Sequence, residues 1–218
     1  MMPFVLGISG GSASGKTWLS QALLAAFGPR TCVHIAHDDY YLPLPEAFRH
    51  RPGDYNFDAP SSLETDLLVD HLDALLAGRP VQVPTYAFDV HDRVGVHTVH
   101  PGPLVLLEGI LLLTDARIRE RLDLAVFVDA PTDVRRERRV HRDVHERGRQ
   151  EAWVRDRFAR HVEPMHQRHV EPTRAHADLV VDGTQALAHA VAAVMARLPD
   201  GLSPQAPHEV RGSPHPLE

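Results

Sequence analysis

The segment GGSASGKT at residues 10–17 restricts the fold of this chain more than any other feature. It fits the pattern G-x-x-x-x-G-K-[ST], in which glycines let the backbone curl so that its N–H groups point inward. The run before it, residues 3–9, has the composition of a buried strand, and residues 16–27 carry apolar side chains at helical spacing. Strand, loop and helix in this order predict a phosphate-binding loop at a helix N-terminus. The alternative is a glycine-rich turn with a purely structural role. The residues expected to bind nucleotide phosphates are Gly10, Gly11, Ser12, Ala13, Ser14, Gly15, Lys16 and Thr17.

Lys16 is the only lysine among the 23 Lys and Arg residues of the 218-residue chain. Its compact ammonium group fits between the β- and γ-phosphates, where a planar guanidinium would fit poorly. We therefore expect Lys16 to be catalytic. The Thr17 hydroxyl is expected to bind Mg²⁺, and Glu108, at the end of a later apolar run, to hold the same ion directly or through water.

Apolar runs alternate with helical patterns along the rest of the chain. Strands are predicted at 31–36, 103–107, 125–130 and 178–181, and helices at 61–77, 132–146, 150–169 and 185–198. Ser61 or Ser62 is expected to cap the first of these helices and Gly78 to end it. Alternation within 81–83 and 94–100 predicts an antiparallel hairpin over about 80–100. The order predicts one α/β domain, residues 1–198, with a parallel sheet flanked by helices on both faces, followed by a flexible proline-rich tail at 199–218.

The composition excludes several classes of function. A formal net charge of −6 disfavours a nucleic-acid binder, and no run approaches the length of a membrane span or has the pattern of a signal peptide. The single cysteine, Cys32, excludes an internal disulfide and is expected to pack within a strand. Paired histidines at 141/145 and 166/169 lack a third ligand and are interpreted as ordinary helix residues rather than a metal site. We expect a cytoplasmic protein that binds neither nucleic acid nor membrane.

Asp38 and Asp39 follow the predicted strand at 31–36, at the edge of a parallel sheet where ligands bind. A carboxylate there, beside Mg²⁺, can orient and deprotonate an alcohol that attacks the γ-phosphate. Asp38 is the preferred base and metal neighbour, and Asp39 is the competing candidate. An Asp pair that only caps a helix is the structural alternative. The base-reading motif N-K-x-D of GTPases is absent, because the chain has no second lysine.

Further motifs follow in a fixed order along the chain: DDYY (38–41), YNFDAP (55–60), PTYAF (84–88) with His91 and Arg93, LLEGILLLTDARIR (106–119), FVDAP (127–131), RRVHRDVHERGR (138–149) and VEPMH through VEPTRAHAD (162–178). With these motifs the chain resembles the uridine kinase family of nucleoside kinases from about residue 4 to 198. The resemblance implies Mg²⁺-dependent transfer of the γ-phosphoryl group of ATP or GTP to the 5′-hydroxyl of uridine, with cytidine as a further acceptor, in pyrimidine salvage. A homotetramer is implied by the resemblance alone.

The resemblance also implies roles for individual residues. Asp38 is the general base, and Tyr41 and Asp58 bind the nucleoside, with the Asp58 carboxylate accepting hydrogen bonds from the ribose hydroxyls. Tyr86 and His91 contact the pyrimidine. In the arginine-rich segment, Arg139 and Arg149 reach the nucleoside. Arg142 and Arg147 contact the donor phosphates from a lid over about 135–165.

Three departures from the family pattern stand out. Ala87 replaces an aspartate in PTYAF, Arg157 occupies the place of a glutamine near the sugar, and VVDGTQ at 180–185 replaces a turn rich in proline, arginine and glycine. The choice between ATP and GTP is left open by the last of these. Two other functions are alternatives: a kinase of the phosphoribulokinase or pantothenate kinase type, and a non-catalytic nucleotide-binding regulator. The presence of Asp38, Asp58 and Arg149 counts against the regulator.

Overall fold

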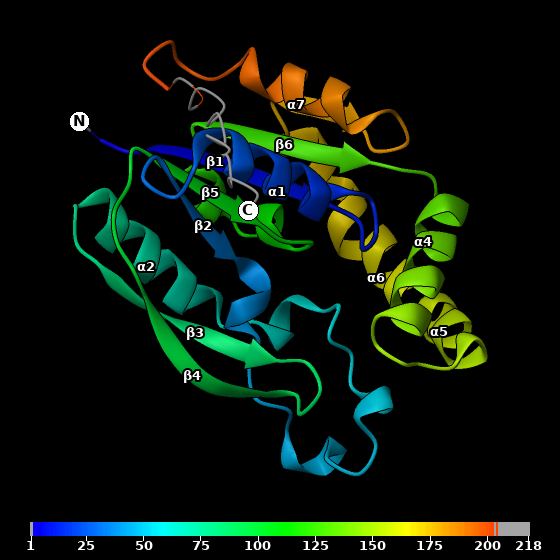
Figure 1. Ribbon diagram of the computed structural model, residues 1–218. Helices are drawn as coiled ribbons and strands as arrows, with labels where there is room; N and C mark the ends of the chain where they lie inside the picture. The colour runs from blue at the N-terminus through cyan, green and yellow to red at the C-terminus, as the bar shows by residue number, and fades with distance from the viewer. Residues whose placement is uncertain (1, 203, 205–218) are drawn as a thin grey trace, which may run out of the picture.

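A five-stranded, entirely parallel sheet forms the centre of the molecule (Figure 1). The computed structural model describes residues 2–202 and 204. The strands lie in the order β2-β5-β1-β6-β7. Their bounds are β1 Phe4–Gly10, β2 Cys32–Ala36, β5 Leu104–Glu108, β6 Leu124–Asp129 and β7 Leu179–Asp182. The predicted parallel sheet is confirmed, with every predicted strand within a residue or two of its observed bounds.

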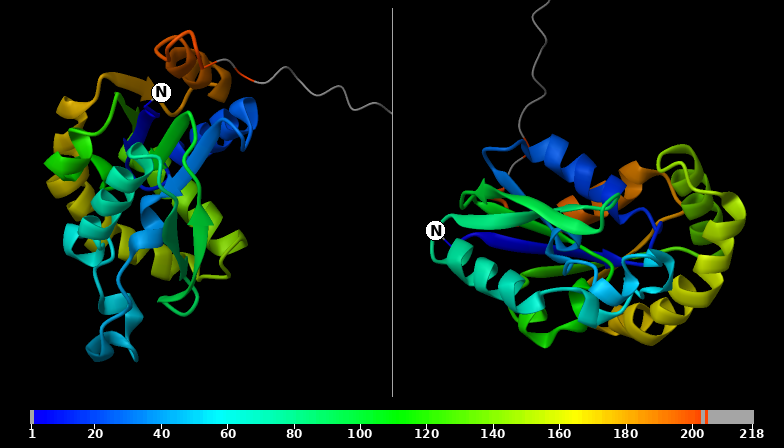
Figure 2. Two further views of the ribbon diagram at one scale, coloured as in Figure 1. Left: turned by 90° about the vertical axis from the view of Figure 1, so that its left-hand side faces the viewer. Right: turned by 90° about the horizontal axis from the view of Figure 1, so that it is seen from below.

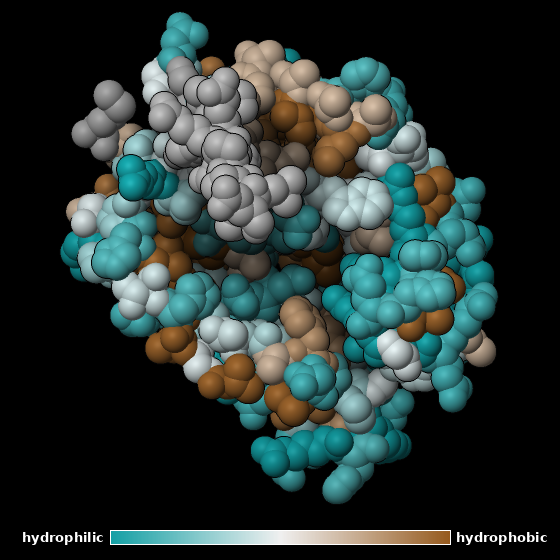
Figure 3. All heavy atoms as spheres, viewed as in Figure 1, coloured by the Kyte–Doolittle hydropathy of each residue, from teal (hydrophilic) through white to brown (hydrophobic). Residues whose placement is uncertain are grey.

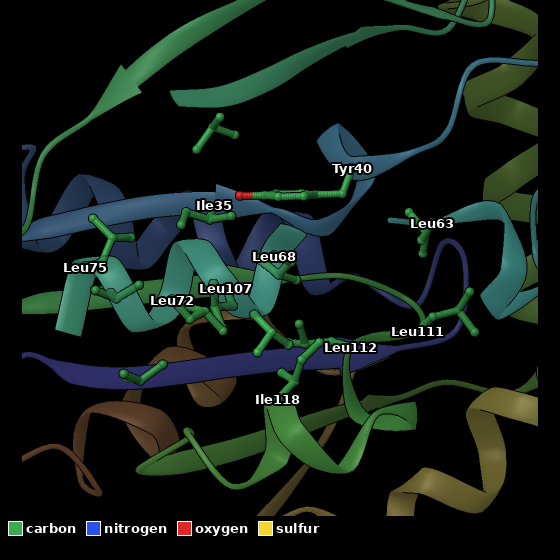
Figure 4. Packing of buried hydrophobic residues seen from close by; sticks show 14 of the residues in the cluster. Ile35, Tyr40, Leu63, Leu68, Leu72, Leu75, Leu107, Leu111, Leu112 and Ile118 are labelled. Carbon is green, nitrogen blue, oxygen red and sulfur yellow. The ribbon is translucent and has the colours of Figure 1, made fainter. Parts of the chain in front are cut away.

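Both faces of this sheet are buried, as its continuous apolar strands require. Side chains alternate across β5: Leu104 and Leu106 pack towards α1 (Lys16–Phe27) and α7 (Leu187–Met195), whereas Leu107 packs towards α2 (Thr65–Leu76). Figure 4 shows the α2 side, where Leu68 and Leu72 meet the sheet. Each fully buried leucine contributes about 1.5–3 kcal/mol to this packing.

Helix α2 begins later than the sequence predicts. Neither Ser61 nor Ser62 caps it, because the Ser62 hydroxyl donates to the carbonyl oxygens of Phe57 (2.8 Å) and Ala59 (2.6 Å) in a preceding 3₁₀ turn. The residue before the first turn of α2 is Glu64. The predicted end holds to within a residue, because α2 ends at Leu76 and Gly78, at φ 74°, follows the C-cap residue Ala77.

A separate two-stranded antiparallel sheet is formed by β3 (Val81–Ala87) and β4 (Asp92–Val99). Figures 1 and 2 show this hairpin apart from the central sheet, close to α2. Arg93 fastens it to the chain that follows β2, donating to the carbonyl oxygens of Tyr40 and Tyr41 at 3.0 Å each and to Glu64 at 2.5 Å. The hairpin is therefore held at the carboxyl end of β2.

Two helices follow β6, as predicted. Helix α4 spans Thr132–His145 and α5 spans Glu151–Arg157. Beyond α5 the chain continues in helical turns that include α6 (Glu163–Met165) and end at residue 176, so this helical region is longer and less regular than the predicted 150–169. A short helix, α3 (Ala116–Arg119), was not predicted.

Cys32 is buried in β2, as expected. Among the described residues, no helix combines the length and apolar character needed to cross a membrane. Most of the predicted tail at 199–218 lies outside the described residues.

Candidate active site

The loop between β1 and α1 has the backbone that the glycine pattern predicts. Gly10 and Gly15 have φ values of 144° and 112°, a region that favours glycine. A Cβ at Gly10 would collide with the carbonyl oxygen of Val128 on the neighbouring strand. The Ser14 amide donates to the Gly11 carbonyl oxygen at 3.1 Å, which closes the loop. Lys16 then begins α1 with its side chain largely buried.

A cleft of about 1540 Å³ opens in front of this loop. It brings together most residues that the sequence singles out: Ser12, Ala13, Gly15, Lys16, Thr17, Asp38, Tyr41, Asp58, His91, Glu108, Arg139, Arg142, Arg147 and Arg149. Gly10, Gly11, Ser14 and Tyr86 do not line it. Figure 3 shows hydrophilic side chains over α4 and α5, which contribute arginines to one wall.

Thr17 and Glu108 form an oxygen-rich pair beside the loop. The Thr17 hydroxyl donates to one Glu108 carboxylate oxygen at 3.3 Å, and the Ser20 hydroxyl donates to the other at 3.2 Å. Ser20 was not predicted, although it lies one helical turn after Lys16. Within residues 2–202 and 204, no cluster of three or more His, Cys, Asp or Glu side chains could hold a metal ion alone. The pair fits Mg²⁺, which takes few protein oxygens and completes its shell with phosphate and water oxygens.

Asp38 lies in a 3₁₀ turn that directly follows β2. Burial raises the pKa of its carboxyl group, and Glu108 and Asp39 act in the same direction, while Lys16 and Arg142 oppose them. Asp38 is thus close to both the loop lysine and the proposed metal pair. Burial also raises the pKa of Asp39, while the Tyr86 backbone on the hairpin acts to lower it. Both carboxylates line the cleft, but Lys16 acts on the pKa of Asp38 and is not among the groups that act on that of Asp39.

Aromatic side chains surround Asp58 at the β2 side of the cleft. The His91 imidazole stacks on Phe57, with ring centroids 4.8 Å apart and planes 22° apart. Burial lowers the pKa of His91, and the nearby Arg149 and Arg157 lower it further, which favours the uncharged form of the ring. Phe57 also lines the cleft. It was missed as a site residue, and its position next to Asp58 is the signal that could have found it.

Tyr86 lies behind this wall rather than in it. Its ring packs against Tyr41 at 5.4 Å and Phe88 at 5.2 Å, and burial raises its pKa to about 12. Its buried hydroxyl has no hydrogen-bond partner among the described residues. Direct contact between Tyr86 and a ligand therefore stays a prediction, whereas its support of Tyr41 is evident in the packing.

The arginines of α4 and the turn after it surround one buried acid, Asp143. Its carboxylate is fully buried, and four guanidinium groups approach it. The distances are 2.9 Å to Arg142, 3.5 Å to Arg147, 3.6 Å to Arg149 and 3.7 Å to Arg139. Arg139 also donates to the Ser12 hydroxyl of the loop at 2.7 Å. Asp143 was not singled out from the sequence, where it is one of several acids among the arginines.

Arg157 replaces the expected glutamine and connects two parts of the cleft wall. It donates to the carbonyl oxygens of Tyr55 (2.8 Å) and Gly53, and its guanidinium lies over Phe57 and Trp153 at 5.8 and 5.6 Å. Helix α5 is thereby fixed to the segment that carries Asp58.

A glycine-rich loop after a central parallel strand, a hydroxyl–carboxylate pair beside it and a carboxylate at the end of β2 define a P-loop kinase. The family model described as Phosphoribulokinase / Uridine kinase family matches residues 5–188, and the chain belongs to this family.

Curated relatives cover nearly the whole chain. A protein named uridine kinase from Chloroflexus aurantiacus is 40% identical over 201 residues, 92% of this chain and 96% of its own length. A uridine kinase from Streptococcus mutans is 40% identical over 180 residues, 82% of this chain and 86% of its own length.

Solved structures share the fold at lower identity. A possible uridine kinase from Bacillus stearothermophilus matches with a TM-score of 0.61 and 20% identity, over 84% of this chain and 90% of its own. Phosphoribulokinase from Rhodobacter spheroides matches with a TM-score of 0.59 and 15% identity, over 84% of this chain and 73% of its own.

Proposed function

We propose that this protein is a uridine kinase that transfers the γ-phosphoryl group of ATP or GTP to the 5′-hydroxyl of uridine, with cytidine as a second acceptor. The observation that carries the proposal is the position of Asp38. It lies in the cleft that the phosphate-binding loop faces, close enough to Lys16 for the ammonium to oppose the rise of its pKa. The identity of about 40% to uridine kinases over most of the chain supports the acceptor.

The loop and the oxygen pair supply the donor half of the reaction. Inward-facing amides and the N-terminus of α1 bind the β-phosphate, and Lys16 neutralises charge between the β- and γ-phosphates. Thr17 and Glu108, together with Asp38, would hold Mg²⁺, which supplies charge neutralisation on the phosphate oxygens when bound. Arg142 and Arg147 add positive charge from the opposite wall as charge builds on the transferring group.

The β2 side of the cleft supplies the acceptor half. Asp58 accepts hydrogen bonds from the vicinal hydroxyls of the ribose, which directs the 5′-hydroxyl towards Asp38. Asp38 accepts the proton of that hydroxyl as it attacks. Tyr41 and His91, with Tyr86 packed behind Tyr41, select the flat pyrimidine ring, and Arg139 and Arg149 close over the nucleoside.

A coupled assay of ADP release with and without uridine tests the proposal. We expect turnover that depends on uridine, and a panel with cytidine, adenosine, deoxynucleosides and ribulose 5-phosphate then defines the acceptor. Asp38→Asn should lose turnover by about 100-fold or more, as expected for removal of a general base, while uridine still binds in equilibrium dialysis. Turnover with ribulose 5-phosphate but not with uridine would contradict the proposal, and so would full activity of Asp38→Asn.

A further inference from the structure

A single 3₁₀ turn carries Asp38, and its own hydrogen bonds hold it weakly. The turn spans His37–Tyr40, directly after β2. Its closing contact, from the Tyr41 amide to the Asp38 carbonyl oxygen, measures 3.5 Å, which is long for a hydrogen bond. A shift of about 1 Å in a reacting group can cost about 100-fold in rate. The position of the Asp38 carboxylate therefore depends on contacts that the turn makes with other elements.

Arg93, on β4, contacts the end of this turn with its whole guanidinium group. Its Nε donates to the Tyr41 carbonyl oxygen and its Nη2 to the Tyr40 carbonyl oxygen, at 3.0 Å each. Its Nη1 forms an ion pair with Glu64 at 2.5 Å. The Arg93 side chain is 23% exposed, so these contacts are largely shielded from water. All three nitrogens are engaged, and an ammonium group, which is a single point charge, cannot reproduce this fork.

Helix α2 and the residue before it hold the same turn independently of Arg93. The Tyr40 hydroxyl lies 2.9 Å from Nδ1 of His71, on α2, and the two rings pack edge to face. The Glu64 amide donates to the Tyr40 carbonyl oxygen at 2.9 Å. The turn is thus tied to α2 by Tyr40 and to the hairpin by Arg93. Loss of Arg93 would release the hairpin while the contacts with α2 stay in place.

Arg93 also belongs to the strand that follows His91. His91 lies two residues earlier in the chain and lines the cleft together with Asp38, whereas Arg93 does not line it. In the hairpin Arg93 pairs with Tyr86, whose ring packs against Tyr41. One guanidinium therefore connects the residue expected to contact the pyrimidine with the turn that carries the expected base. Because Arg93 lies outside the cleft, it can influence the reaction only through these neighbours.

We propose that Arg93 is a positioning residue that holds the Asp38 carboxylate in line with an acceptor bound at His91. This inference rests on the proposed function, because it takes Asp38 as the base that accepts the proton of the 5′-hydroxyl. Without the guanidinium, the turn and the hairpin can shift relative to each other, and the attacking oxygen and its base lose their alignment. The expected effect is a fall in kcat of about 10- to 100-fold. The KM for ATP should stay nearly unchanged, since the phosphate-binding loop belongs to a different strand and helix.

The variant Arg93→Lys separates geometry from charge. Lysine keeps a positive charge beside Glu64 but cannot donate to both carbonyl oxygens at once. We expect its kcat at saturating uridine to fall by about 10- to 100-fold, with an unchanged KM for ATP. Arg79→Lys, at an exposed position before β3, is the matched control and should keep full activity. An Arg93→Lys enzyme with the kcat of the parent protein, or a loss that appears only as a higher KM for ATP, would overturn the inference.

Chemical rescue of Arg93→Ala distinguishes positioning from a general loss of stability. Guanidinium at millimolar concentrations, far below those that unfold proteins, can occupy the space of the missing side chain and donate to the same carbonyl oxygens. We expect it to restore part of kcat, whereas methylammonium should not, because it lacks the planar fork. Asp38→Asn should gain nothing from either cation. Equal rescue by both cations, or none by guanidinium, would count decisively against a positioning role.

Hydrogen exchange measures the same attachment without any acceptor. In Arg93→Lys, amides in a peptide that covers residues 37–42 should exchange faster than in the parent protein, because the turn opens more often. Peptides from the phosphate-binding loop should exchange at equal rates in both proteins. Equal exchange at residues 37–42 would overturn the inference even if kcat fell. A parent protein that is inactive with uridine, in contrast, would refute the proposed function and leave the exchange rates to decide whether Arg93 holds the turn.

Discussion

Lys16 is the residue at which lysine and arginine are least interchangeable in this chain. Its stem is buried at the first turn of α1, in a loop whose width is set by Gly10 and Gly15. A guanidinium is broader and binds through a planar fork. The chain uses arginine at all 22 of its other cationic positions, which indicates that the ammonium is required here.

Lys16→Arg should therefore lower kcat by about 100-fold or more, comparable to the loss of other groups that stabilise developing charge. Uridine affinity should change little, because the acceptor contacts lie on the β2 side. Arg30→Lys, at an exposed turn after α1, is the matched control and should keep full activity. Steady-state kinetics on both variants decide the point; a Lys16→Arg enzyme with normal kcat would show that the shape of the cation is irrelevant.

His37, next to Asp38, predicts how stability depends on pH. Its side chain is buried, both ring nitrogens lack partners among the described residues, and burial lowers its pKa to about 4. Since the unfolded chain binds this proton at an ordinary pKa of about 6.5, acid favours unfolding. Stability should fall as pH drops from about 6.5 to about 4, by about 3 kcal/mol from this one group.

Urea unfolding between pH 7.5 and 4.5 measures this effect. His37→Asn should show a shallower loss of unfolding free energy in acid than the parent protein, and His50→Asn, at an exposed position, should follow the parent. Parallel curves for the parent and His37→Asn would disprove the assignment of the acid sensitivity to His37.

At the scale of elements, the sequence predicts the ends of a helix well when the residues that end it act on the backbone next to them. The glycines around α1 give its start and end correctly, because they act on the backbone of adjacent residues. The prediction that Ser62 caps α2 is wrong, because its hydroxyl donates to carbonyl oxygens of the preceding 3₁₀ turn instead. Which of these hydrogen bonds the hydroxyl makes depends on how the segment that begins at Phe57 packs. Asp143 could not be singled out for a different reason: several acids are interleaved with the arginines of this segment, and only the structure shows which of the carboxylates is buried among them.

The four arginines around Asp143 make α4 and the turn after it an electrostatic unit. Removing the one buried carboxylate would leave these cations facing each other, and breaking a buried ion pair costs about 3–5 kcal/mol. Asp143→Asn should lower the unfolding free energy by about this amount and raise the KM for ATP, because the arginines lose their common anchor.

Asp133→Asn, an exposed acid on the same helix, is the control and should leave both quantities unchanged. Chemical denaturation and steady-state kinetics provide the measurements. An Asp143→Asn protein with unchanged stability and an unchanged KM for ATP would show that the carboxylate does not organise these arginines.

At the scale of the whole molecule, the cleft lies between the carboxyl ends of the strands and the arginine-bearing helices. This general architecture follows from the sequence, because parallel strands place all their carboxyl ends at one edge. The relative position of α4 and α5 over that edge could not be predicted, since it depends on contacts such as those of Arg157 with Gly53 and Tyr55. The predicted lid remains a proposal about movement of this region.

Partial proteolysis tests that movement. Trypsin cleaves after arginine, and Arg147 and Arg149 lie in the turn between α4 and α5 with side chains 35% and 24% exposed. If this region closes over both substrates, a non-hydrolysable ATP analogue together with uridine should slow cleavage there by about tenfold, corresponding to about 1.4 kcal/mol of protection against local opening. Mass spectrometry of the peptides gives the rates. Cleavage after Arg30, on the far side of α1, is the internal control and should not change. Equal rates of cleavage at Arg147 with and without ligands would mean that this region does not close and that its arginines bind phosphate without moving. The effect of Asp143→Asn on the KM for ATP would then come from the lost charge and not from an impaired closure.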